Sequence, residues 1–340
     1  MDLLREETER GNNIIKYMTS SNLTNKSNWT NISKPIIGLA PMDGITDAAF
    51  REIADKYGKP DVLFTEFVPA EGIAHGATRL FRSLQRHPTK TPIVAQLFGK
   101  TPKAFYESAK IVCKLGFDGV DINMGCPDNN IYKKGGGAKL ISEPALAQEI
   151  IKAAKQGVDG RVPVTVKTRT GIDKPITSEW ISALLEAEPD AITLHGRTLA
   201  QMYRGHADWE QIALGASLAK GTKTKFLGNG DVESMQEARE KTKTYDVDGV
   251  LIGRAALGNP WIFGDHMPTQ DERFAVMIEH CRYFIKYRTG LKLFPMRKHL
   301  AWYVQKFDGA AKMRDALMHI ETVEDVEKVI ASFRPPKLDK

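Results

Sequence analysis

The sequence has few of the features that mark membrane, secreted or disulfide-stabilised proteins. It contains no run of about 18 or more apolar residues, which excludes a membrane-spanning helix. Residues 1–13 are charged where a signal peptide is apolar. The three cysteines are too few and too scattered for a disulfide framework or a zinc site. We therefore expect a cytoplasmic protein without a bound metal, and its 340 residues, 42% of them hydrophobic, can bury a large core.

A glycine-rich dinucleotide fingerprint is also missing after the first expected strand, which argues against an open, doubly wound sheet. Instead, short runs rich in Val, Ile, Leu and Phe alternate with segments of helical period. The runs cover residues 36–42, 61–67, 92–99, 119–125, 162–169, 191–197, 225–231 and 249–254. Eight strand–helix units in roughly 230 residues predict an α/β fold of the (β/α)8 TIM-barrel type. Polar residues end nearly every run, as catalytic groups do in such barrels.

The strand pattern stops after Pro260, and apolar residues from Phe274 to Ile285 recur at helical spacing. We therefore predict a catalytic barrel over residues 34–267 and a small all-α domain over residues 268–338. Residues 1–33 are polar and rich in Asn, Ser and Thr, so we interpret them as a flexible extension.

Positive charge is concentrated in the predicted helical domain. The chain as a whole carries a net charge of +6, whereas residues 274–314, the basic segment, contain nine lysines and arginines against only Glu279 and Asp308. Positive charge interleaved with aromatic rings favours a nucleic-acid partner. A solvated helix face explains the same charges equally well, so composition alone leaves both interpretations open.

Two glycine-containing loops after the last two expected strands fit a phosphate group. They are Asn229-Gly230-Asp231 and Gly253-Arg254, where backbone N–H groups and the arginine side chain can approach an anion. Ordinary strand-to-helix turns also use glycine, which is the alternative interpretation.

Three polar residues end other strands. Lys167 follows an apolar run and needs an anionic partner, which a substrate carboxylate, a Schiff-base carbonyl or the electron-rich edge of a reduced flavin would supply. Gln96 can both donate and accept hydrogen bonds, as a flavin ring requires. His195 could donate to the same ligand, although an isolated histidine is usually structural.

Cys126 lies in the loop Asn-Met-Gly-Cys-Pro after the fourth run and precedes the glycine-rich residues 133–140. A thiol with an ordinary pKa of about 8.5 is mostly protonated at neutral pH, which suits a proton donor, while a nucleophile remains the alternative. Cys113 and Cys281 lie on helical stripes and fit a buried core.

Taken together, these motifs resemble the tRNA-dihydrouridine synthases, and the bacterial B-type branch most of all. The matching stretches are APMDGITDAAFR (40–51), PIVAQLFG (92–99), VDINMGCPDNNIYKKGGGAKLI (120–141), VPVTVKTRTGID (162–173), ITLHGRTLAQMYRGHADW (192–209), LGNGDV (227–232), GVLIGRAALGNPWIF (249–263) and RKHLAWY (297–303). The resemblance spans about residues 35–335.

The resemblance implies a barrel that binds FMN and reduces the C5–C6 double bond of uridine in tRNA, with NADPH as the reductant. Flavin N5 would deliver hydride to C6, and Cys126 would protonate C5. The implied cofactor residues are Pro41, Met42 and Asp43 at the isoalloxazine, Gln96, Lys167 and His195 around the flavin, and Asn229, Gly230, Asp231, Gly253 and Arg254 at the ribityl phosphate. The implied substrate residues are Asn123 and Arg169 near the uracil and Arg297 and Lys298 in the helical domain.

Asp43 departs from the Ala or Ser that is common at its position in the family. No protein partner is implied. Two alternatives remain at this point: an FMN barrel dehydrogenase that acts on a free pyrimidine or another small molecule, and a tRNA-binding protein on a barrel that has lost its chemistry.

Overall fold

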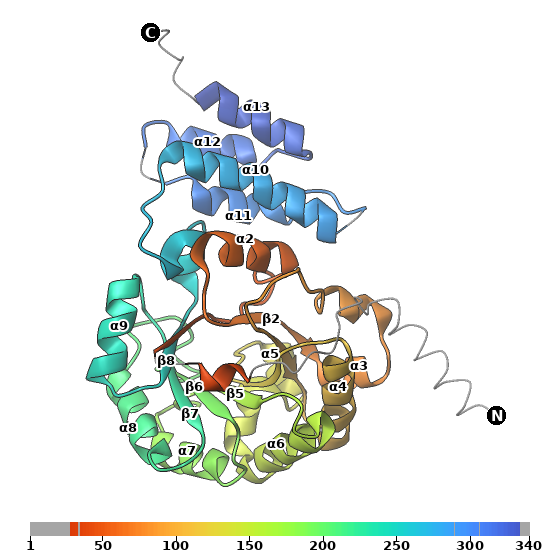
Figure 1. Cartoon of the computed structure of the whole chain (residues 1–340), viewed down its shortest axis with the longest axis vertical. Coiled ribbons are helices and arrows are strands. Elements are labelled where there is room, and N and C mark those ends of the chain that lie inside the picture. Colours follow the sequence, from red (N-terminus) through yellow and green to blue (C-terminus); the bar gives the residue numbers. More distant parts are fainter. Residues whose placement is uncertain (1–27, 33–34, 289, 306, 334–340) are drawn as a thin grey trace, which may run out of the picture.

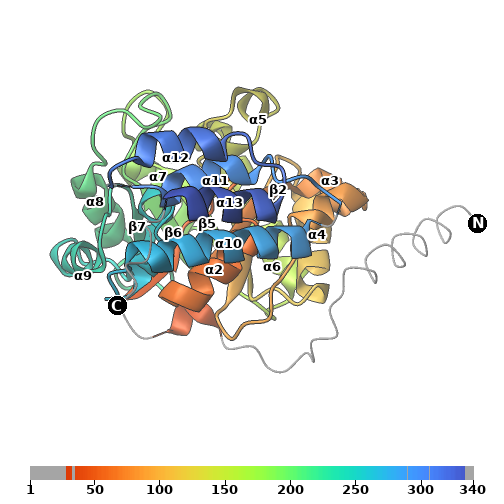
Figure 2. The same cartoon turned by 90° about the horizontal axis from the view of Figure 1, so that it is seen from above.

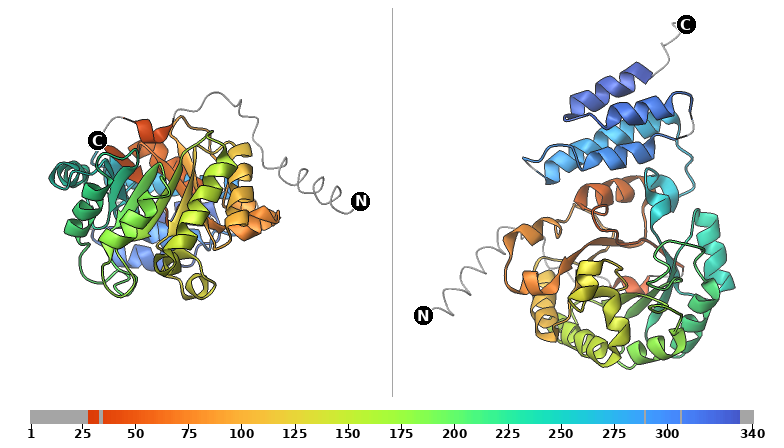
Figure 3. Two further views of the ribbon diagram at one scale, coloured as in Figure 1. Left: turned by 90° about the horizontal axis from the view of Figure 1, so that it is seen from below. Right: turned by 180° about the vertical axis from the view of Figure 1, so that it is seen from behind.

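Eight parallel strands close into a barrel in the order in which they occur in the chain (Figure 3). The barrel closes where β1 pairs with β8, with Ile36 opposite Gly249. The strands are β1 (Ile36–Leu39), β2 (Leu63–Pro69), β3 (Ile93–Phe98), β4 (Gly119–Met124), β5 (Val164–Arg169), β6 (Ala191–His195), β7 (Lys225–Asn229) and β8 (Gly249–Ile252). Each apolar run supplies one strand, so the predicted (β/α)8 barrel is confirmed.

This computed structural model describes residues 28–32, 35–288, 290–305 and 307–333. The barrel helices are α2 (Ala48–Gly58), α3 (Ala70–Ala74), α4 (Pro102–Lys114), α5 (Asn129–Lys133), α6 (Pro144–Val158), α7 (Thr177–Leu185), α8 (Trp209–Ala219) and α9 (Met235–Thr244). Short 3-10 turns are η1 (Trp29–Asn31), η2 (Thr78–Arg82), η3 (Gly137–Ser142), η4 (Arg254–Ala256) and η5 (Pro260–Phe263). Prolines in the first turn begin α4 and α6, because a missing N–H costs nothing there.

Trp29 closes the amino-terminal end of the barrel. Its ring is fully buried and meets the Phe64 ring edge-on, with 5.9 Å between the ring centres. The sequence placed residues 1–33 in a flexible extension, and for residues 28–32 the structure corrects that assignment. A tryptophan ring gains more from burial than its polar neighbours lose, which the local composition does not reveal. The rest of the predicted extension, residues 1–27, 33 and 34, lies outside the described residues.

Four helices after the barrel form a separate layer against α2 (Figures 1 and 2). They are α10 (Gln270–Tyr287), α11 (Met296–Tyr303), α12 (Ala310–Leu317) and α13 (Val323–Phe333). A capping box begins α10: Thr269 accepts from the N–H of Glu272, whose carboxylate accepts in return from the N–H of Thr269. Within the described part of the chain, no helix is both long and apolar enough to cross a membrane.

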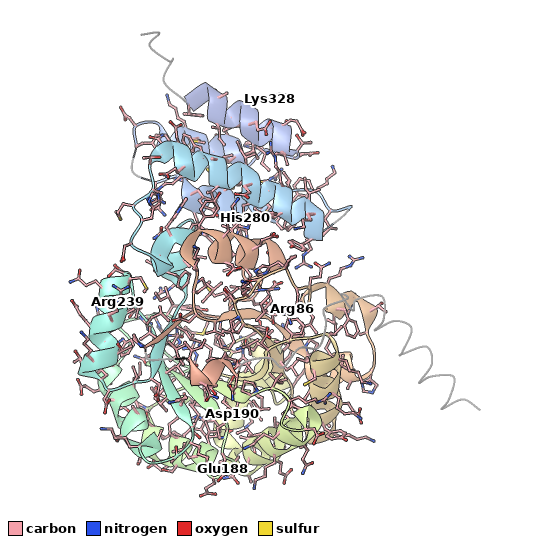
Figure 4. The ribbon with its side chains drawn as sticks, in the orientation of Figure 1. Arg86, Glu188, Asp190, Arg239, His280 and Lys328 are labelled. Carbon is pink, nitrogen blue, oxygen red and sulfur yellow. The ribbon has the colours of Figure 1, made fainter. Side chains whose placement is uncertain are left out.

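The helical layer and the barrel share one hydrophobic core. Ala49 and Ile53 of α2 and Trp261 of η5 belong to the same buried cluster as Phe274 and Met277 of α10. His280 lies between α10 and α2 (Figure 4), where its ring meets Phe50 at 5.8 Å between centres. This core crosses the boundary expected at residue 267, because α2 buries one face against the barrel and the other against α10.

Candidate active site at the barrel mouth

A cavity of about 1260 Å³ opens at the carboxyl ends of the strands. It brings together every barrel residue that the sequence singled out: Pro41, Met42, Asp43, Gln96, Asn123, Cys126, Lys167, Arg169, His195, Asn229, Gly230, Asp231, Gly253 and Arg254. Arg273 and Gln305 from the helical layer also line it. Arg297 and Lys298 do not line the cavity.

The β1–α2 loop carries Met42 and Asp43 along one wall of the cavity. Thr46 ties this loop together, because its hydroxyl lies 3.1 Å from both the N–H and the carbonyl of Met42. Gly44 takes a left-handed conformation with φ of 66°, and its N–H donates to the Glu66 carboxylate at 2.9 Å. Burial raises the pKa of Asp43, while nearby Lys298 opposes the shift.

Glu66 connects this loop to the helical layer. Its second carboxylate oxygen accepts from Arg288, at the end of α10, at 3.2 Å. Arg288 also lies 3.8 Å from Asp47 at the start of α2. Glu66 is one of the polar residues that end the apolar runs and Arg288 is one of the cations of the basic segment, but the sequence pattern did not predict that the two pair.

Cys126 lies in the loop between β4 and α5, and its side chain and backbone are 8% exposed. The carbonyl of Cys126 accepts from the N–H of Ala138 at 3.1 Å. Gly137, with φ of 60°, packs so closely that a Cβ there would lie 3.1 Å from the Cβ of Cys126. Burial raises the pKa of the Cys126 thiol, so the group stays protonated at neutral pH.

Asn123, in β4, anchors the loop that carries Cys126, which we call the thiol loop. Its side-chain oxygen accepts from the N–H groups of Gly125 at 3.0 Å and Cys126 at 2.8 Å. Its amide nitrogen donates to the side-chain oxygen of Gln96 at 3.0 Å. Gln96 in turn donates to Asp121 at 2.6 Å. Asp121 was missed by sequence reasoning, although a carboxylate inside the run Gly-Val-Asp-Ile-Asn was visible.

Lys167 presents a cation to the cavity floor. Among the described residues, its ammonium makes no hydrogen bond or ion pair within the protein. Burial and the neighbouring Arg169 lower the pKa of Lys167 to about 8, and Asp121 partly opposes this. Burial raises the pKa of Asp121 to about 6. At neutral pH Lys167 therefore carries a charge that a bound anion would stabilise.

His195 is neutral at physiological pH. Its pKa is lowered strongly by burial, and the charges of Lys167, Arg169, Arg197 and Arg254 lower it further. The Arg197 guanidinium lies 3.2 Å from the Nε2 atom of His195. Since arginine can only donate, Nε2 accepts and the ring proton is on Nδ1.

Asp231 joins two arginines rather than presenting a free carboxylate. It accepts from Arg197 at 2.6 Å, from Arg254 at 2.6 Å and from the N–H of Ala207 at 2.7 Å. Asp231 adopts a φ of 48°, an uncommon conformation for a residue with a side chain. Asp231 thus orients Arg254 at the cavity edge. Arg197 is one of the polar residues that end the apolar runs, but sequence reasoning assigned it no role at the site.

The remaining predicted residues have well-defined contacts. Asn229 donates to the carbonyl of Leu251 at 2.7 Å, which couples the ends of β7 and β8. Arg169 donates to the carbonyls of Gly125 at 2.7 Å and Thr198 at 3.1 Å. Among the described residues Arg169 has no carboxylate partner, and burial lowers its pKa.

Four of the eight described cations of the basic segment are paired with carboxylates that lie outside the segment. The pairs are Arg282 with Glu327, Lys286 with Glu52, Arg288 with Glu66 and Lys292 with Glu321. Arg297 donates to the carbonyl of Ile320 at 2.9 Å and stacks over Phe294 at 4.5 Å. Lys298 is exposed, and its ammonium would lie 3.2 Å from a Cβ placed on Gly44. The basic segment therefore displays far less charge than its composition predicts.

Comparison with known proteins identifies the same family as the sequence motifs. A family described as dihydrouridine synthase matches residues 38–334. The probable tRNA-dihydrouridine synthase 1 of Synechocystis is 38% identical over 299 residues, which cover 84% of this chain and 82% of the relative. The probable tRNA-dihydrouridine synthase of Staphylococcus aureus is 33% identical over 318 residues, 90% of this chain and 95% of the relative. The probable tRNA-dihydrouridine synthase 2 of Bacillus subtilis is 32% identical over 320 residues, 92% and 98%.

Among solved structures, a 2-naphthoyl-CoA reductase complex superposes with a TM-score of 0.50 at 12% identity, over 69% of this chain and 52% of that chain. That similarity supports the barrel fold alone. The family match extends from β1 to the end of α13, and two of the three relatives align over at least 95% of their length. The chain therefore belongs to the dihydrouridine synthase family of oxidoreductases, as its motifs predict.

Proposed function

We propose that this enzyme reduces the C5–C6 double bond of uridines in tRNA to 5,6-dihydrouridine, with FMN as the cofactor and NADPH as the reductant. The observation that carries the proposal is one cavity faced by both a protonated thiol, Cys126, and a cation, Lys167, that has no partner in the described part of the chain. Reduction of an activated double bond needs a proton donor, and the flavin needs compensation of negative charge.

The cavity residues fit FMN. The Lys167 ammonium faces the cavity without a partner among the described residues, and the Arg254 side chain stands 57% exposed at its edge. We assign Pro41, Met42 and Asp43 to the isoalloxazine wall, Gln96, Lys167 and His195 to the ring edge, and Asn229, Gly230, Gly253 and Arg254 to the ribityl phosphate. Asp231 acts there by orienting Arg254. When bound, FMN would supply the hydride that adds to C6 of the uracil.

Cys126 holds the proton that adds to C5. Burial raises its pKa, so the thiol keeps its proton until carbon C5 requires it. Gly137 and Ala138 pack against the Cys126 loop and limit its movement. Asn123 and Arg169 line the cavity beside Cys126, where we expect them to contact the uracil.

A uridine inside folded tRNA must leave its stack to reach this cavity. We propose that the helical layer, residues 268–338 in the sequence prediction, contacts the RNA backbone while the cavity binds the base. Arg273 and Gln305 connect the two surfaces, because both line the cavity from the helical layer. Lys298, exposed beside Gly44, adds positive charge near the same rim. Arg297 supports that surface through its contacts with Ile320 and Phe294.

The decisive experiment compares two substrates. The FMN-loaded protein is given NADPH with either unmodified tRNA or free uridine, and dihydrouridine is measured by mass spectrometry. We expect formation on tRNA to exceed formation on free uridine by at least about a hundredfold. Comparable rates would instead support a dehydrogenase acting on a small molecule. A protein that binds tRNA but cannot be loaded with FMN would support an RNA-binding protein without redox chemistry.

A further inference from the structure

A chain of polar side chains inside the barrel connects β5 to the thiol loop. Thr165 donates through its hydroxyl to one carboxylate oxygen of Asp121 at 2.6 Å, and Gln96 donates to the other oxygen at 2.6 Å. Asn123 donates to the Gln96 oxygen at 3.0 Å. Asp121 and Gln96 are 1% and 0% exposed, so water cannot replace any of these partners.

The two ends of this chain fix its direction independently. At the upper end, the backbone N–H groups of Gly125 and Cys126 can only donate, so the oxygen of Asn123 must face them. Its amide nitrogen must then face Gln96. At the lower end, an ionised carboxylate can only accept, so the amide nitrogen of Gln96 must face Asp121. Both ends demand the same orientation of Gln96, and neither amide can turn over without losing a buried hydrogen bond.

Burial of the carboxylate is unfavourable in itself. It raises the pKa of Asp121 to about 6, and the hydrogen bonds from Gln96 and Thr165 reduce the shift. A barrel interior of this kind is normally filled by branched apolar side chains, which would avoid that cost. The Asp121 carboxylate fixes the orientation of the Gln96 and Asn123 amides beside the reacting groups. This role explains why a charged side chain occupies an interior position.

We propose that Asp121 is a positioning residue, which acts through Gln96 and Asn123 to hold the main chain of Cys126 so that its thiol faces the cavity. The catalytic meaning of this role rests on the proposed function, whereas the mechanical coupling does not. Asp121 also fixes which hydrogen-bonding atoms of Gln96 remain for a ligand. One amide hydrogen and one oxygen lone pair are left, and their sides cannot be exchanged.

The first test inverts the direction of the hydrogen bonds between Asp121, Gln96 and Asn123. N123D keeps an acceptor for the N–H groups of Gly125 and Cys126 but offers no donor to Gln96. Gln96 must then turn over, which brings its oxygen against the Asp121 carboxylate. The double variant D121N/N123D supplies a donor at position 121, so every bond in the inverted series can form again. It has the same net charge as the unaltered protein and one buried carboxylate fewer than N123D.

We expect N123D to lower the melting temperature of the FMN-loaded protein by about 5 °C or more, and D121N/N123D to recover at least half of that loss. D121N alone should change it less, because the Thr165 hydroxyl can reverse and accept. We call the hydrogen-bonded series Thr165–Asp121–Gln96–Asn123 the relay. If the two losses of melting temperature simply add, so that the double variant is the least stable of the three, the relay does not exist.

The second test asks whether the relay reaches the thiol. T165V removes one of the two buried hydrogen bonds to the Asp121 carboxylate, whereas D121A removes both and is the only one of the two that releases Gln96. Alkylation of the protein by iodoacetamide is followed by mass spectrometry, with C126A giving the background from Cys113 and Cys281. We expect D121A to raise the alkylation rate of Cys126 at least about threefold and T165V to change it less than about twofold. Equal effects of the two variants would make Asp121 a general stability residue and overturn the proposal.

These measurements need neither tRNA nor turnover, so their outcome is independent of the proposed reaction. If the protein passes both tests but makes no dihydrouridine, the relay is supported and the proposed function is wrong. If the protein makes dihydrouridine but the stability changes are additive, the proposed function is supported and the relay is wrong.

Discussion

The barrel mouth and the helical layer use positive charge in opposite ways. In the helical layer, four of the eight described cations of the basic segment pair with acids from elsewhere in the chain, among them Glu52, Glu321 and Glu327. At the mouth, Lys167 and Arg169 have no carboxylate partner among the described residues. Exposed ion pairs contribute little to stability, whereas a buried cation without a partner costs free energy until an anion binds. The number of charges in a segment is therefore a poor guide to the charge that a ligand meets.

The largest effect should come from removing the proposed proton donor at the mouth. We expect C126A to lower the rate of dihydrouridine formation in tRNA at least about a hundredfold, because general acid catalysis typically contributes that much or more. FMN content and the NADPH-driven reduction of the flavin should stay near those of the unaltered protein. Dihydrouridine per tRNA is the measurement, and unchanged turnover would exclude Cys126 from the reaction.

The next effect should come from Lys167, whose ammonium has no partner among the residues that the structure describes. We expect K167M to weaken FMN binding about tenfold or more, as a fluorescence titration would measure, since a charged hydrogen bond contributes about 1.5–3 kcal/mol. The pKa of about 8 gives a pH dependence: Lys167 is charged below this value and neutral above it. FMN affinity should therefore fall as the pH rises above 8, with the midpoint raised by the bound anion. In K167M that fall should disappear, and a persistent pH dependence would assign it to another group.

A third effect tests the contact between the two regions. R288M leaves the buried Glu66 carboxylate without its arginine, which should lower the free energy of unfolding by about 1–3 kcal/mol. E66Q/R288M should lose less, because a neutral amide can still accept from the N–H of Gly44. Chemical denaturation measures both. Equal losses would mean that the two side chains do not interact energetically.

The smallest effect separates exposed from paired cations in the helical layer. We expect K298E to weaken tRNA binding a few-fold and to reduce the salt dependence of the binding constant by about one phosphate contact. R282Q removes a cation already paired with Glu327, so its binding should remain within about twofold of the unaltered protein. Binding titrations at several salt concentrations measure both, and equal losses would show that pairing within the protein does not matter.

Much of this molecule could be predicted from the sequence, because the relevant signals are local. Apolar runs of strand length gave all eight strands, and prolines marked the starts of α4 and α6. In a closed parallel barrel the carboxyl ends of all strands meet, so residues as distant as Met42 and Arg254 had to share one cavity.

The errors arose where a side chain's partner lies far away in the sequence. Glu66 is more than two hundred positions from Arg288, so their contact leaves no local trace. Glu52 is similarly far from Lys286, and Glu327 and Glu321 follow their partners Arg282 and Lys292 by 45 and 29 positions, so these contacts also leave no local trace. Trp29 was placed in an extension because its neighbours are polar, whereas its burial depends on Phe64 and the starts of other strands.

The core shared by α2 and α10 has a thermodynamic consequence. Neither the helical layer nor this side of the barrel can open without exposing Ile53, Trp261 and Met277 to water. Such a molecule should unfold in a single calorimetric transition. Truncation of the chain at residue 267 would expose a hydrophobic surface on α2 and η5 and would not leave an independently folded barrel. The helical layer that we propose to bind tRNA and the barrel that we propose to perform the reduction would then move as one rigid body, so the angle between them is set during folding rather than at each encounter with a substrate.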